Sequence, residues 1–203
     1  MLIKTLPVGH METNCYIVTD ENTLDCAVID PGDESNTILD YVESNNLNVK
    51  AIFITHGHFD HTRAADTVSE ETGAPIWIHS ADFDPKDAGH YKFASDGDVL
   101  FYKDGDIINI GGLTFIIFAM PGHSPGGVTI RCGRALFVGD TLFRDSCGRT
   151  DLPGGNMDTL LGSLRRLSSF EGDFEVYPGH MDATTLDRER GVNYYVKYAV
   201  KKG

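Results

Sequence analysis

The sequence predicts an α/β (α+β) protein built as a four-layer αββα sandwich, in which two mainly antiparallel or mixed β-sheets pack face to face and helices cover the outside. Three observations predict this architecture. Short β-rich runs alternate with amphipathic helical segments, and the order of strands, helix and strand occurs twice along the chain. The length of 203 residues suits one well-buried core but is short for two ordinary domains. We therefore expect a single domain over residues 1–203.

The first half of the chain contains the first set of elements. Its strand-like runs are rich in β-branched or aromatic residues, and they cover residues 14–19, 26–30, 51–55 and 76–79. Apolar residues at helical spacing predict one helix from Ser35 and a second helix over residues 60–71. Residues 82–104 are polar and punctuated, so we expect an irregular surface excursion there.

The second half repeats this order of elements without detectable sequence repetition. Its strand-like runs cover residues 107–110, 113–120, 128–132, 135–138 and 174–177. An amphipathic helix is predicted over residues 157–167, and residues 185–202 predict a helical tail. No low-complexity linker separates the two halves, which favours one domain.

The charge of the chain argues against one class of partner. The chain has 17 Lys and Arg against 30 Asp and Glu, which gives a formal net charge of −13. A phosphate-binding surface needs clustered cations, so nucleic acid is not an expected partner. Most of the acidic charge is interpreted as a solvated surface. We expect a small-molecule substrate and a monomer or small homo-oligomer.

Composition and cysteine usage indicate the compartment. No apolar run approaches the roughly 20 residues that span a bilayer, so membrane insertion is not expected. The N-terminal segment lacks the long apolar core of a signal peptide. The four cysteines are scattered without a Cys-x-x-Cys pair, at Cys15, Cys26, Cys132 and Cys147. Reduced thiols and a cytoplasmic location are the resulting expectations.

The segment His56-Gly57-His58-Phe59-Asp60-His61 follows a hydrophobic strand and carries the strongest chemical signal. Residues two apart in extended backbone point the same way, so His56 and His58 can bind one ion. The turn into the next helix then directs Asp60 and His61 toward a second ion. The alternative is a polar loop of hydrogen-bonded histidines. The pattern is expected by chance roughly once in a thousand such sequences, which disfavours that alternative.

Three further residues of ligand type follow strand-like runs in the second half. They are His123 in Pro121-Gly122-His123, Asp140 in Gly139-Asp140-Thr141, and His180 in Pro178-Gly179-His180. Each alone is typical of a surface turn. Together the chain offers five imidazoles and two carboxylates at strand ends, where loops gather at one edge of a sandwich. This set is enough for two ions with open positions for water and substrate.

These motifs resemble those of the metallo-β-lactamase superfamily over residues 14–193, most of the chain. Besides the ligand motifs, the matching stretches are Val28-Ile29-Asp30-Pro31-Gly32, Gly139-Asp140-Thr141-Leu142-Phe143 and Gly148-Arg149-Thr150-Asp151. The resemblance implies two metal sites bridged by Asp140. It assigns His56, His58 and His123 to the first metal, and Asp60, His61 and His180 to the second metal.

Within the superfamily, the chain is similar to the short glyoxalase II-like branch, the hydroxyacylglutathione hydrolases. The segment 148–151 and the tail from Thr185 to Asn193 carry this likeness. It implies a thioester hydrolase that cleaves S-2-hydroxyacylglutathione, such as S-lactoylglutathione, to a hydroxy acid and glutathione. It also implies two divalent ions, zinc first, with iron or manganese as alternatives. The β-lactamase branches lack a bridging aspartate at the position of Asp140, which argues against antibiotic hydrolysis.

Individual residues take predicted roles from this assignment. Asp60 is predicted to be catalytic, because it would hold the second ion and orient the nucleophile that the metals generate from water. Arg149 is either a substrate-binding residue, whose planar fork suits a carboxylate, or an ordinary surface arginine. Asp30 either supports a ligand imidazole or forms a plain turn. Three histidines have no place in the constellation: His10, His79 and His90.

Two other functions remain open. Persulfide dioxygenases also resemble the sequence, including a segment like residues 147–151, and would use one iron held by His56, His123 and Asp140. A non-catalytic binding module is disfavoured, because degenerate members of such families usually lose ligands.

A serine nucleophile is disfavoured on physical grounds. The segment Gly122-His123-Ser124-Pro125-Gly126 matches the Gly-x-Ser-x-Gly nucleophile elbow. An elbow takes an oxyanion-hole donor from the backbone N–H of the residue after the serine, and that residue here is Pro125, which has no N–H. Ser124 is therefore expected to support a turn or a neighbouring ligand.

Overall fold

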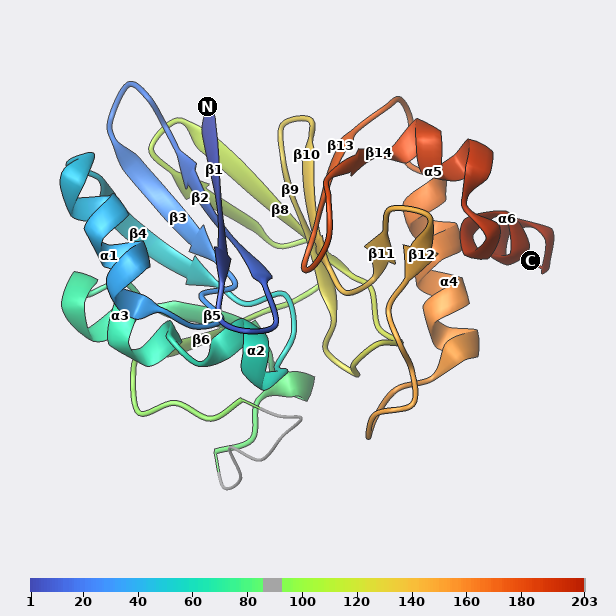
Figure 1. The fold of residues 1–203 in the computed structure, drawn as a ribbon, viewed down its shortest axis with the longest axis horizontal. Helices are drawn as coiled ribbons and strands as arrows, with labels where there is room; N and C mark the ends of the chain where they lie inside the picture. Colours follow the sequence, from blue (N-terminus) through green and yellow to red (C-terminus); the bar gives the residue numbers. More distant parts are fainter. Residues whose placement is uncertain (86–92, 203) are drawn as a thin grey trace.

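The computed structural model describes residues 1–85 and 93–202, and it has the predicted four layers (Figure 1). Helices α1 and α3 cover one sheet, the two sheets face each other in the middle, and α4, α5 and α6 cover the other sheet. The expected αββα sandwich is therefore confirmed.

The first sheet contains six strands in the order β1-β2-β3-β4-β5-β6. Their bounds are β1 Leu2–Val8, β2 Thr13–Thr19, β3 Asp25–Ile29, β4 Asn48–Phe53, β5 Ile76–His79 and β6 Val99–Tyr102. The strands β1 to β3 pair antiparallel, whereas β3 to β6 pair parallel. The sheet is therefore mixed, as expected.

The second sheet also contains six strands, in the order β14-β13-β10-β9-β8-β7. Their bounds are β7 Ile107–Ile110, β8 Leu113–Ala119, β9 Val128–Cys132, β10 Ala135–Gly139, β13 Glu175–Pro178 and β14 Thr184–Thr185. All neighbours pair antiparallel except β10 and β13, which run parallel. A separate two-stranded hairpin joins β11 Leu142–Phe143 to β12 Ser146–Cys147.

The helices lie outside the two sheets. Their bounds are α1 Ser35–Ser44, α2 Phe59–Thr62, α3 Ala65–Thr72, α4 Met157–Ser168, α5 Leu186–Val192 and α6 Tyr194–Lys202, with a 3₁₀ turn η1 at Ser80–Asp82. Helix α2 is a single turn directly after the segment His56–His58. It therefore belongs to the site more than to the helical layers.

Alternating side chains on the strands build three hydrophobic layers, because successive residues of a strand face opposite sides of its sheet. In β10, Leu136 and Val138 belong to the layer under α4 and α6, whereas Ala135 and Phe137 belong to the layer between the sheets. A third layer lies between the first sheet and helices α1 and α3. Both faces of β10 are thus buried, which explains its continuous apolar run.

One prediction about the first half is wrong. Residues 82–104 are not irregular throughout, because β6 lies within them and pairs parallel with β5 at the edge of the sheet. Tyr102 and Asp82 are almost fully buried. The strand β6 has only four residues and is flanked by polar residues, so it is difficult to recognise in the sequence. Its edge position leaves Leu100 and Phe101 exposed, so the run lacks the pattern of a buried strand.

Two predicted helices are each divided in two. Residues 60–71 form α2 and α3, because the N–H of Ala64 donates to the carbonyl of Pro31 at 3.0 Å and does not continue the helix. The tail divides at Asn193, whose extended backbone (φ −66°, ψ 122°) ends α5. Asn193 Oδ1 then accepts the N–H of Tyr195 at 2.9 Å and starts α6. The sequence patterns did not predict β1, β14 or the β11–β12 hairpin.

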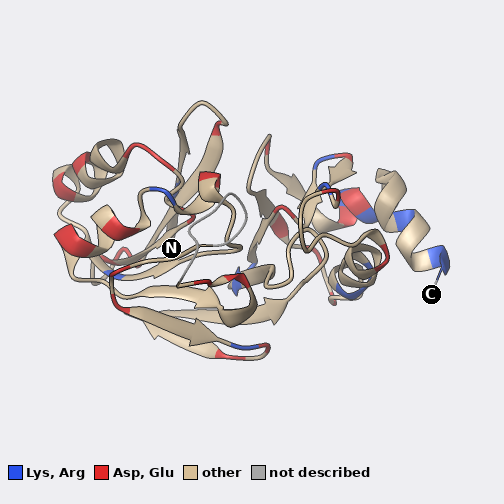
Figure 2. Ribbon diagram, turned by 90° about the horizontal axis from the view of Figure 1, so that it is seen from below, with Lys and Arg blue, Asp and Glu red and all other residues tan. Residues whose placement is uncertain are grey.

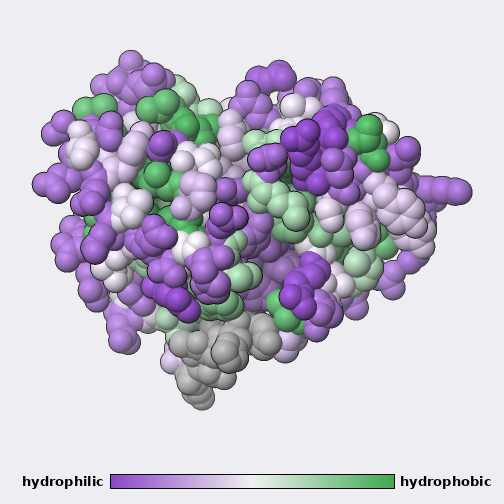
Figure 3. Space-filling view, viewed as in Figure 1, coloured by the Kyte–Doolittle hydropathy of each residue, from purple (hydrophilic) through white to green (hydrophobic). Residues whose placement is uncertain are grey.

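The surface is polar and acidic. Asp and Glu lie on both halves of the molecule and outnumber Lys and Arg (Figure 2). Hydrophilic side chains cover most of the face in Figure 3, where hydrophobic side chains form small separate groups. Within residues 1–85 and 93–202, no helix has the length and apolar character to cross a membrane.

Candidate metal centre

The seven predicted ligand side chains meet at one edge of the sandwich, where strands of both sheets end. They are His56 and His58 after β4, Asp60 and His61 in α2, His123 after β8, Asp140 after β10, and His180 after β13. Strands β8, β10 and β13 run in one direction, so their carboxyl ends reach the same edge. The fold thereby gathers ligands that are up to 124 positions apart, from residue 56 to residue 180.

The first group contains the buried residues His56, His58 and His123. Their ring centroids are 4.7 Å, 4.7 Å and 4.6 Å apart. The Nδ1 atom of His58 lies 2.9 Å from the Nε2 atom of His123. Three imidazoles with converging nitrogens form an arrangement that suits a metal ion.

The second group contains Asp60, His61 and His180. Asp60 Oδ2 lies 3.1 Å from His180 Nε2 and 3.6 Å from His61 Nε2. Asp140 lies between the groups. Its Oδ1 is 3.5 Å from His61 Nε2, and its Oδ2 is 3.5 Å from His123 Nε2. Asp140 thus approaches members of both groups, as the predicted bridging role requires.

The contacts of the Nδ1 atoms orient three of the imidazoles. These partners are oxygens that accept hydrogen bonds, namely Asp30 Oδ2 for His61 at 3.0 Å, the Arg149 carbonyl for His123 at 2.7 Å, and the Met11 carbonyl for His180 at 3.2 Å. Because an acceptor faces each Nδ1, that nitrogen carries the proton. The Nε2 atom of each ring is then left as a ligand.

Asp30 and Thr55 orient a fourth imidazole. Thr55 Oγ1 donates to Asp30 Oδ2 at 2.6 Å and therefore accepts from His56 Nδ1 at 3.1 Å. Asp30 also accepts the backbone N–H of Thr55 at 2.7 Å and is almost fully buried. The structure thus favours the supporting role of Asp30 over a plain turn, since it acts on His61 directly and on His56 through Thr55.

The unpaired polar atoms of the site fit a pair of metal ions. Among the residues that the structure describes, the buried atoms His56 Nε2, His61 Nε2 and Asp140 Oδ1 make no hydrogen bond. Burying such atoms without partners is costly. Imidazole nitrogens and carboxylate oxygens are common ligands of zinc, iron and manganese. Cations at the two groups would therefore satisfy the atoms that the protein leaves unpaired.

Comparison with known proteins decides the family. Residues 8–180 match the metallo-beta-lactamase superfamily. The chain belongs to the metallo-β-lactamase superfamily. The hydroxyacylglutathione hydrolase GloC of Haemophilus influenzae is 32% identical over 209 residues, which cover 97% of this chain and 98% of that protein. The probable metallo-hydrolase YqgX of Bacillus subtilis is 33% identical over 206 residues, which cover 95% of this chain and 96% of that protein.

Solved structures share the fold over nearly the whole chain. BLEG-1 B3 metallo-beta-lactamase has a TM-score of 0.87 and 31% identity, and the match covers 96% of this chain and 99% of that chain. ETHE1 from Myxococcus xanthus has a TM-score of 0.86 and 28% identity, and the match covers 98% of this chain and 88% of that chain. TTHA1623 in a di-iron-bound form has a TM-score of 0.81 and 33% identity, and the match covers 95% of this chain and 99% of that chain. Membership of this superfamily indicates a metal-dependent hydrolase. The substrate and the metal have to be inferred from the residues of the site.

The charges of this superfamily site shift the pKa values of its histidines. Burial and the neighbouring His123 lower the pKa of His58 to about 4. Burial also lowers the pKa of His61, but the carboxylates of Asp30 and Asp140 outweigh burial and raise it to about 9. Burial likewise lowers the pKa of His56, so His56 and His58 favour the neutral form, whereas carboxylates surround the histidines of the second group.

A pocket of about 490 Å³ opens over the centre. Five of the seven predicted ligands line it, namely His58, Asp60, His123, Asp140 and His180. Its apolar lining comes from Met11, Phe59, Phe143, Leu152 and Met181. The pocket thus places apolar surface beside the predicted ligands, which suits the apolar part of a small molecule.

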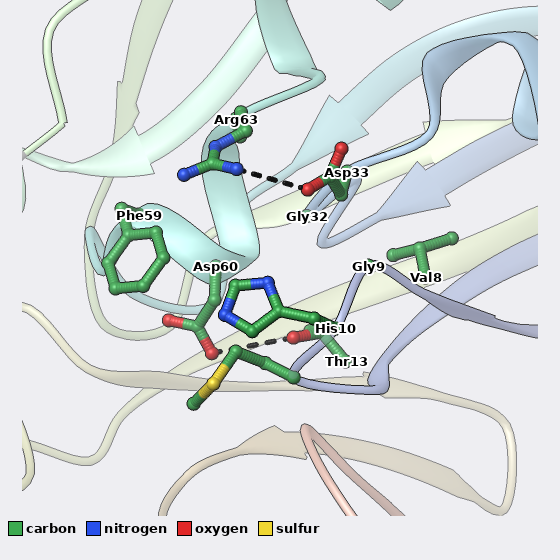
Figure 4. Close-up of a pocket in the computed structure, with 10 residues that line it drawn as sticks. Val8, Gly9, His10, Thr13, Gly32, Asp33, Phe59, Asp60 and Arg63 are labelled. Atoms are coloured by element: carbon green, nitrogen blue, oxygen red, sulfur yellow. Dashed lines mark hydrogen bonds and ion pairs between the residues drawn. The ribbon is translucent and has the colours of Figure 1, made fainter.

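A smaller pocket adjoins this one and shares Met11, Phe59 and Asp60 with it (Figure 4). In this pocket, Thr13 Oγ1 donates to Asp60 Oδ2 at 3.4 Å. The hydroxyl of Thr13 therefore helps to fix the carboxylate that is predicted to be catalytic.

Arg149 lies at the main pocket, but its side chain already has a partner. Its Nε and NH2 atoms donate to the carboxylate of Asp151 at 2.7 Å and 2.6 Å, and this contact lowers the pKa of Asp151 to about 2. The backbone carbonyl of Arg149 orients His123. Substrate binding by the guanidinium stays a prediction, whereas the backbone contact belongs to the structure of the site.

The remaining predictions about single residues divide as follows. Ser124 is buried, and its Oγ makes no hydrogen bond within the described part of the chain, so no base is placed to activate it. His10 is exposed beside the smaller pocket, and His79 Nδ1 accepts the N–H of Ala81 at 3.2 Å. His90 lies outside the described residues.

Sequence reasoning missed three supports of the site. Thr55 directly precedes the ligand segment, but only the fold shows that it links Asp30 to His56. Asp82 accepts the N–H of Gly57, which lies between His56 and His58, but the sequence indicates that its segment lies at the surface. The backbone carbonyl of Met11 carries no sequence signal, because every residue has one.

Proposed function

We propose that the protein is a binuclear metal-dependent thioester hydrolase that cleaves S-2-hydroxyacylglutathione, such as S-lactoylglutathione, to a hydroxy acid and glutathione. The observation that carries this proposal is the position of Asp140, which lies between two groups of ligand residues beneath an open pocket. The identity of 32% with the hydroxyacylglutathione hydrolase GloC of Haemophilus influenzae supports the choice of substrate.

In this proposal, His56, His58 and His123 hold the first ion, and Asp60, His61 and His180 hold the second. Asp140, which lies between His61 and His123, would be a ligand of both ions. We propose zinc as the native metal, with iron and manganese as the alternatives. When bound, such ions would polarise a carbonyl oxygen and lower the pKa of water to about 7, which would supply a nucleophile at neutral pH.

The chain's own residues orient the reaction. Asp60 holds its carboxylate against His180 at 3.1 Å and against the Thr13 hydroxyl at 3.4 Å, so the direction of its free lone pairs is fixed. In that position it accepts a hydrogen bond from the attacking nucleophile. Phe59 and Leu152 offer apolar surface to the acyl chain and exclude water from part of the pocket. The guanidinium of Arg149 binds a carboxylate of the thiol carrier.

The titratable side chains that line the pocket favour a thiol leaving group. Among its described lining residues, only Cys147 and Arg149 are titratable side chains outside the proposed ligand set. Burial raises the pKa of Cys147 to about 11, and a guanidinium keeps its proton above pH 12. Neither is a suitable acid near pH 7. A thiol with a solution pKa near 8.5 leaves as thiolate without a donated proton, whereas an amide nitrogen must be protonated.

The setting of the reaction is also proposed. We propose a cytoplasmic enzyme with a small-molecule substrate and no nucleic-acid partner. The acidic surface supports the absence of a nucleic-acid partner. The four cysteines are free thiols and none forms a disulfide, which suits a reducing compartment.

The test compares substrates on one metal-loaded preparation. We expect kcat/KM for S-lactoylglutathione to exceed that for a chromogenic β-lactam by at least about 1,000-fold, because only the thioester releases a stable anion without an acid. Oxygen uptake with glutathione persulfide is recorded alongside, and a chelator-treated sample is the control. Preference for the β-lactam, or oxygen-dependent turnover of the persulfide without thioesterase activity, contradicts the proposal.

A further inference from the structure

Asp82 is a fully buried carboxylate that takes no part in the proposed reaction. It ends the turn η1 after β5 and is 0% exposed. It does not line the pocket over the metal centre. Its two oxygens accept backbone hydrogen bonds, Oδ2 from the N–H of Gly57 at 2.9 Å and Oδ1 from the N–H of Gly126 at 2.6 Å.

The two amide donors belong to the two loops that carry the first group of ligands. Gly57 lies between His56 and His58, and Gly126 lies three residues after His123. One carboxylate therefore ties together loops that come from different sheets. The adjoining strand ends are joined by a separate bond from the N–H of Val128 to the carbonyl of Thr55 at 2.9 Å, so Asp82 adds a second tie nearer the ligands.

The approach of Asp82 to both loops is too close for any side chain. A Cβ on Gly57 would lie 2.4 Å from the carbonyl oxygen of Asp82, and a Cβ on Gly126 would lie 2.8 Å from its Cγ. A Cβ atom essentially never lies within 3.0 Å of a non-bonded heavy atom in a folded protein. Glycine at these two positions is thus what permits the carboxylate to reach both amides.

We propose that Asp82 is a positioning residue that holds the loops 56–58 and 123–126 in the arrangement in which His56, His58 and His123 bind the first metal ion. This inference rests on the metal centre of the proposed function, but not on the thioester substrate. Asp82 reaches the ion only through the backbone of the two loops.

The second group is held by other contacts, so the effect of Asp82 is selective. His61 is oriented by Asp30, Asp60 by Thr13, and His180 by the carbonyl of Met11. None of these contacts involves Asp82. Removing the carboxylate should therefore weaken binding of the first ion and leave binding of the second nearly unchanged.

The test measures zinc binding by the metal-free full-length protein in competition with a chromophoric chelator. The variant Asp82→Asn keeps the shape of the side chain but places an NH2 donor against one of the two amide donors. We expect it to lose roughly 10- to 100-fold in affinity for one zinc ion, the usual cost of removing a contact that orients metal ligands. Its affinity for the other ion should stay within about threefold.

Asp20 offers a matched control. It is also buried, and it also accepts two backbone N–H bonds, from Gly112 at 2.7 Å and from Asn22 at 3.0 Å. It follows β2 at the end opposite the metal centre. Asp20→Asn should lower the melting temperature without changing either zinc affinity, which separates positioning from general loss of stability.

Either of two results would overturn the inference: wild-type zinc affinities in Asp82→Asn, or an equal affinity loss in Asp20→Asn. If Asp82→Asn does not fold, hydrogen exchange on the metal-free wild type decides. The amides of Gly57 and Gly126 must then be protected, and exchange at unprotected rates contradicts the inference. Zinc binding with these properties but no thioesterase activity contradicts the proposed function and leaves the role of Asp82 standing.

Discussion

At the scale of single residues, the candidate metal centre is organised by atoms that are not themselves predicted ligands. Asp30 contacts His61 directly and His56 through Thr55, and the backbone carbonyl of Arg149 contacts His123. Each contact fixes a ring and selects the nitrogen that faces the centre. Contacts within the protein therefore orient these predicted ligands without a metal ion.

Asp60 provides the first residue-level prediction. Asp60→Asn keeps the size of the side chain but removes the charge that faces His180 and His61. We expect kcat for the thioester to fall by at least about 100-fold, because the nucleophile loses its acceptor, while the fold persists. Steady-state kinetics at full metal loading and circular dichroism check this result.

Asp33→Asn is the matched control, because Asp33 lines the same smaller pocket as Asp60 but is not a predicted ligand. Among the described residues, its carboxylate forms an ion pair with Arg63. The substitution should leave kcat unchanged. Activity of Asp60→Asn within about threefold of wild type would show that Asp60 does not orient the nucleophile.

Arg149 provides a prediction about binding. Arg149→Ala should raise KM for S-lactoylglutathione roughly 3- to 10-fold and leave kcat within about threefold, because an exposed charge pair contributes about 1 kcal/mol. Arg144→Ala is the control, since Arg144 is also exposed but pairs with Asp182 and does not line the pocket. Equal KM values for the two variants would assign Arg149 to the surface pair with Asp151 alone.

The structure brings the seven predicted ligand residues together, and four of them could be singled out from the sequence because their spacing is local. Three histidines and one aspartate lie within residues 56–61, a density that is typical of a metal site. Among the orienting residues, the sequence suggested Asp30, but the others could not be predicted in this way. Asp82 is 25 positions from the amide of Gly57 that it contacts, and only burial of both groups in the folded chain makes the contact visible.

At the scale of secondary-structure elements, the tail fixes one wall of the pocket. Asn193 Nδ2 donates to the carbonyls of Phe143 at 3.3 Å and Ser146 at 2.9 Å, which belong to the β11–β12 hairpin. Phe143, Ser146 and the adjoining Cys147 line the pocket. The segment 185–193 that resembles glyoxalase II therefore supports the site structurally and does not itself line it.

Glu189 anchors this tail and provides a stability prediction. Its buried carboxylate accepts from the hydroxyl of Thr184, the guanidinium of Arg188, the amide of Asn193 and the N–H of Asp145. Glu189→Gln replaces one acceptor oxygen with a donor, so we expect a loss of about 2–4 kcal/mol in the free energy of unfolding. Denaturant titration measures it. Glu171→Gln makes the same change at an exposed site and should cost less than about 0.5 kcal/mol.

The pH dependence of this anchor has a definite sign. Burial raises the pKa of Glu189, but the hydrogen bonds from Thr184 and Asn193 outweigh burial and lower it. A carboxyl with a lowered pKa in the folded state stabilises above its unfolded pKa of about 4.3 and loses that contribution as the pH falls further. The stability gap between wild type and Glu189→Gln should therefore shrink below about pH 4. A gap that stays constant from pH 7 to pH 3 would contradict this account.

Several of the elements that sequence patterns missed share a physical cause. Strand β6 and the β11–β12 hairpin are short, and their pairing partners, not their own composition, keep them extended. The breaks in the two predicted helices come from tertiary hydrogen bonds, such as that from the N–H of Ala64 to Pro31. Periodicity along a sequence does not contain such contacts.

At the scale of the whole molecule, the repeated order of strands and helices predicted the layers, because each sheet must bury both faces. The same fold brings the ends of β4, β8, β10 and β13 to one edge, and this convergence turns weak local motifs into a seven-residue centre. The order of strands within each sheet was not predictable, since pairing depends on contacts between distant segments.

The number of metal ions per chain tests the central claim most directly. Elemental analysis of the protein, as purified and after reconstitution with zinc, should give two ions per chain in the wild type and in His10→Ala, because His10 lies beside the site but outside both ligand groups. His123→Ala should retain one ion, because only the first group loses a ligand. A wild type that holds a single iron, and never more than one metal after reconstitution, would contradict the two-metal hydrolase.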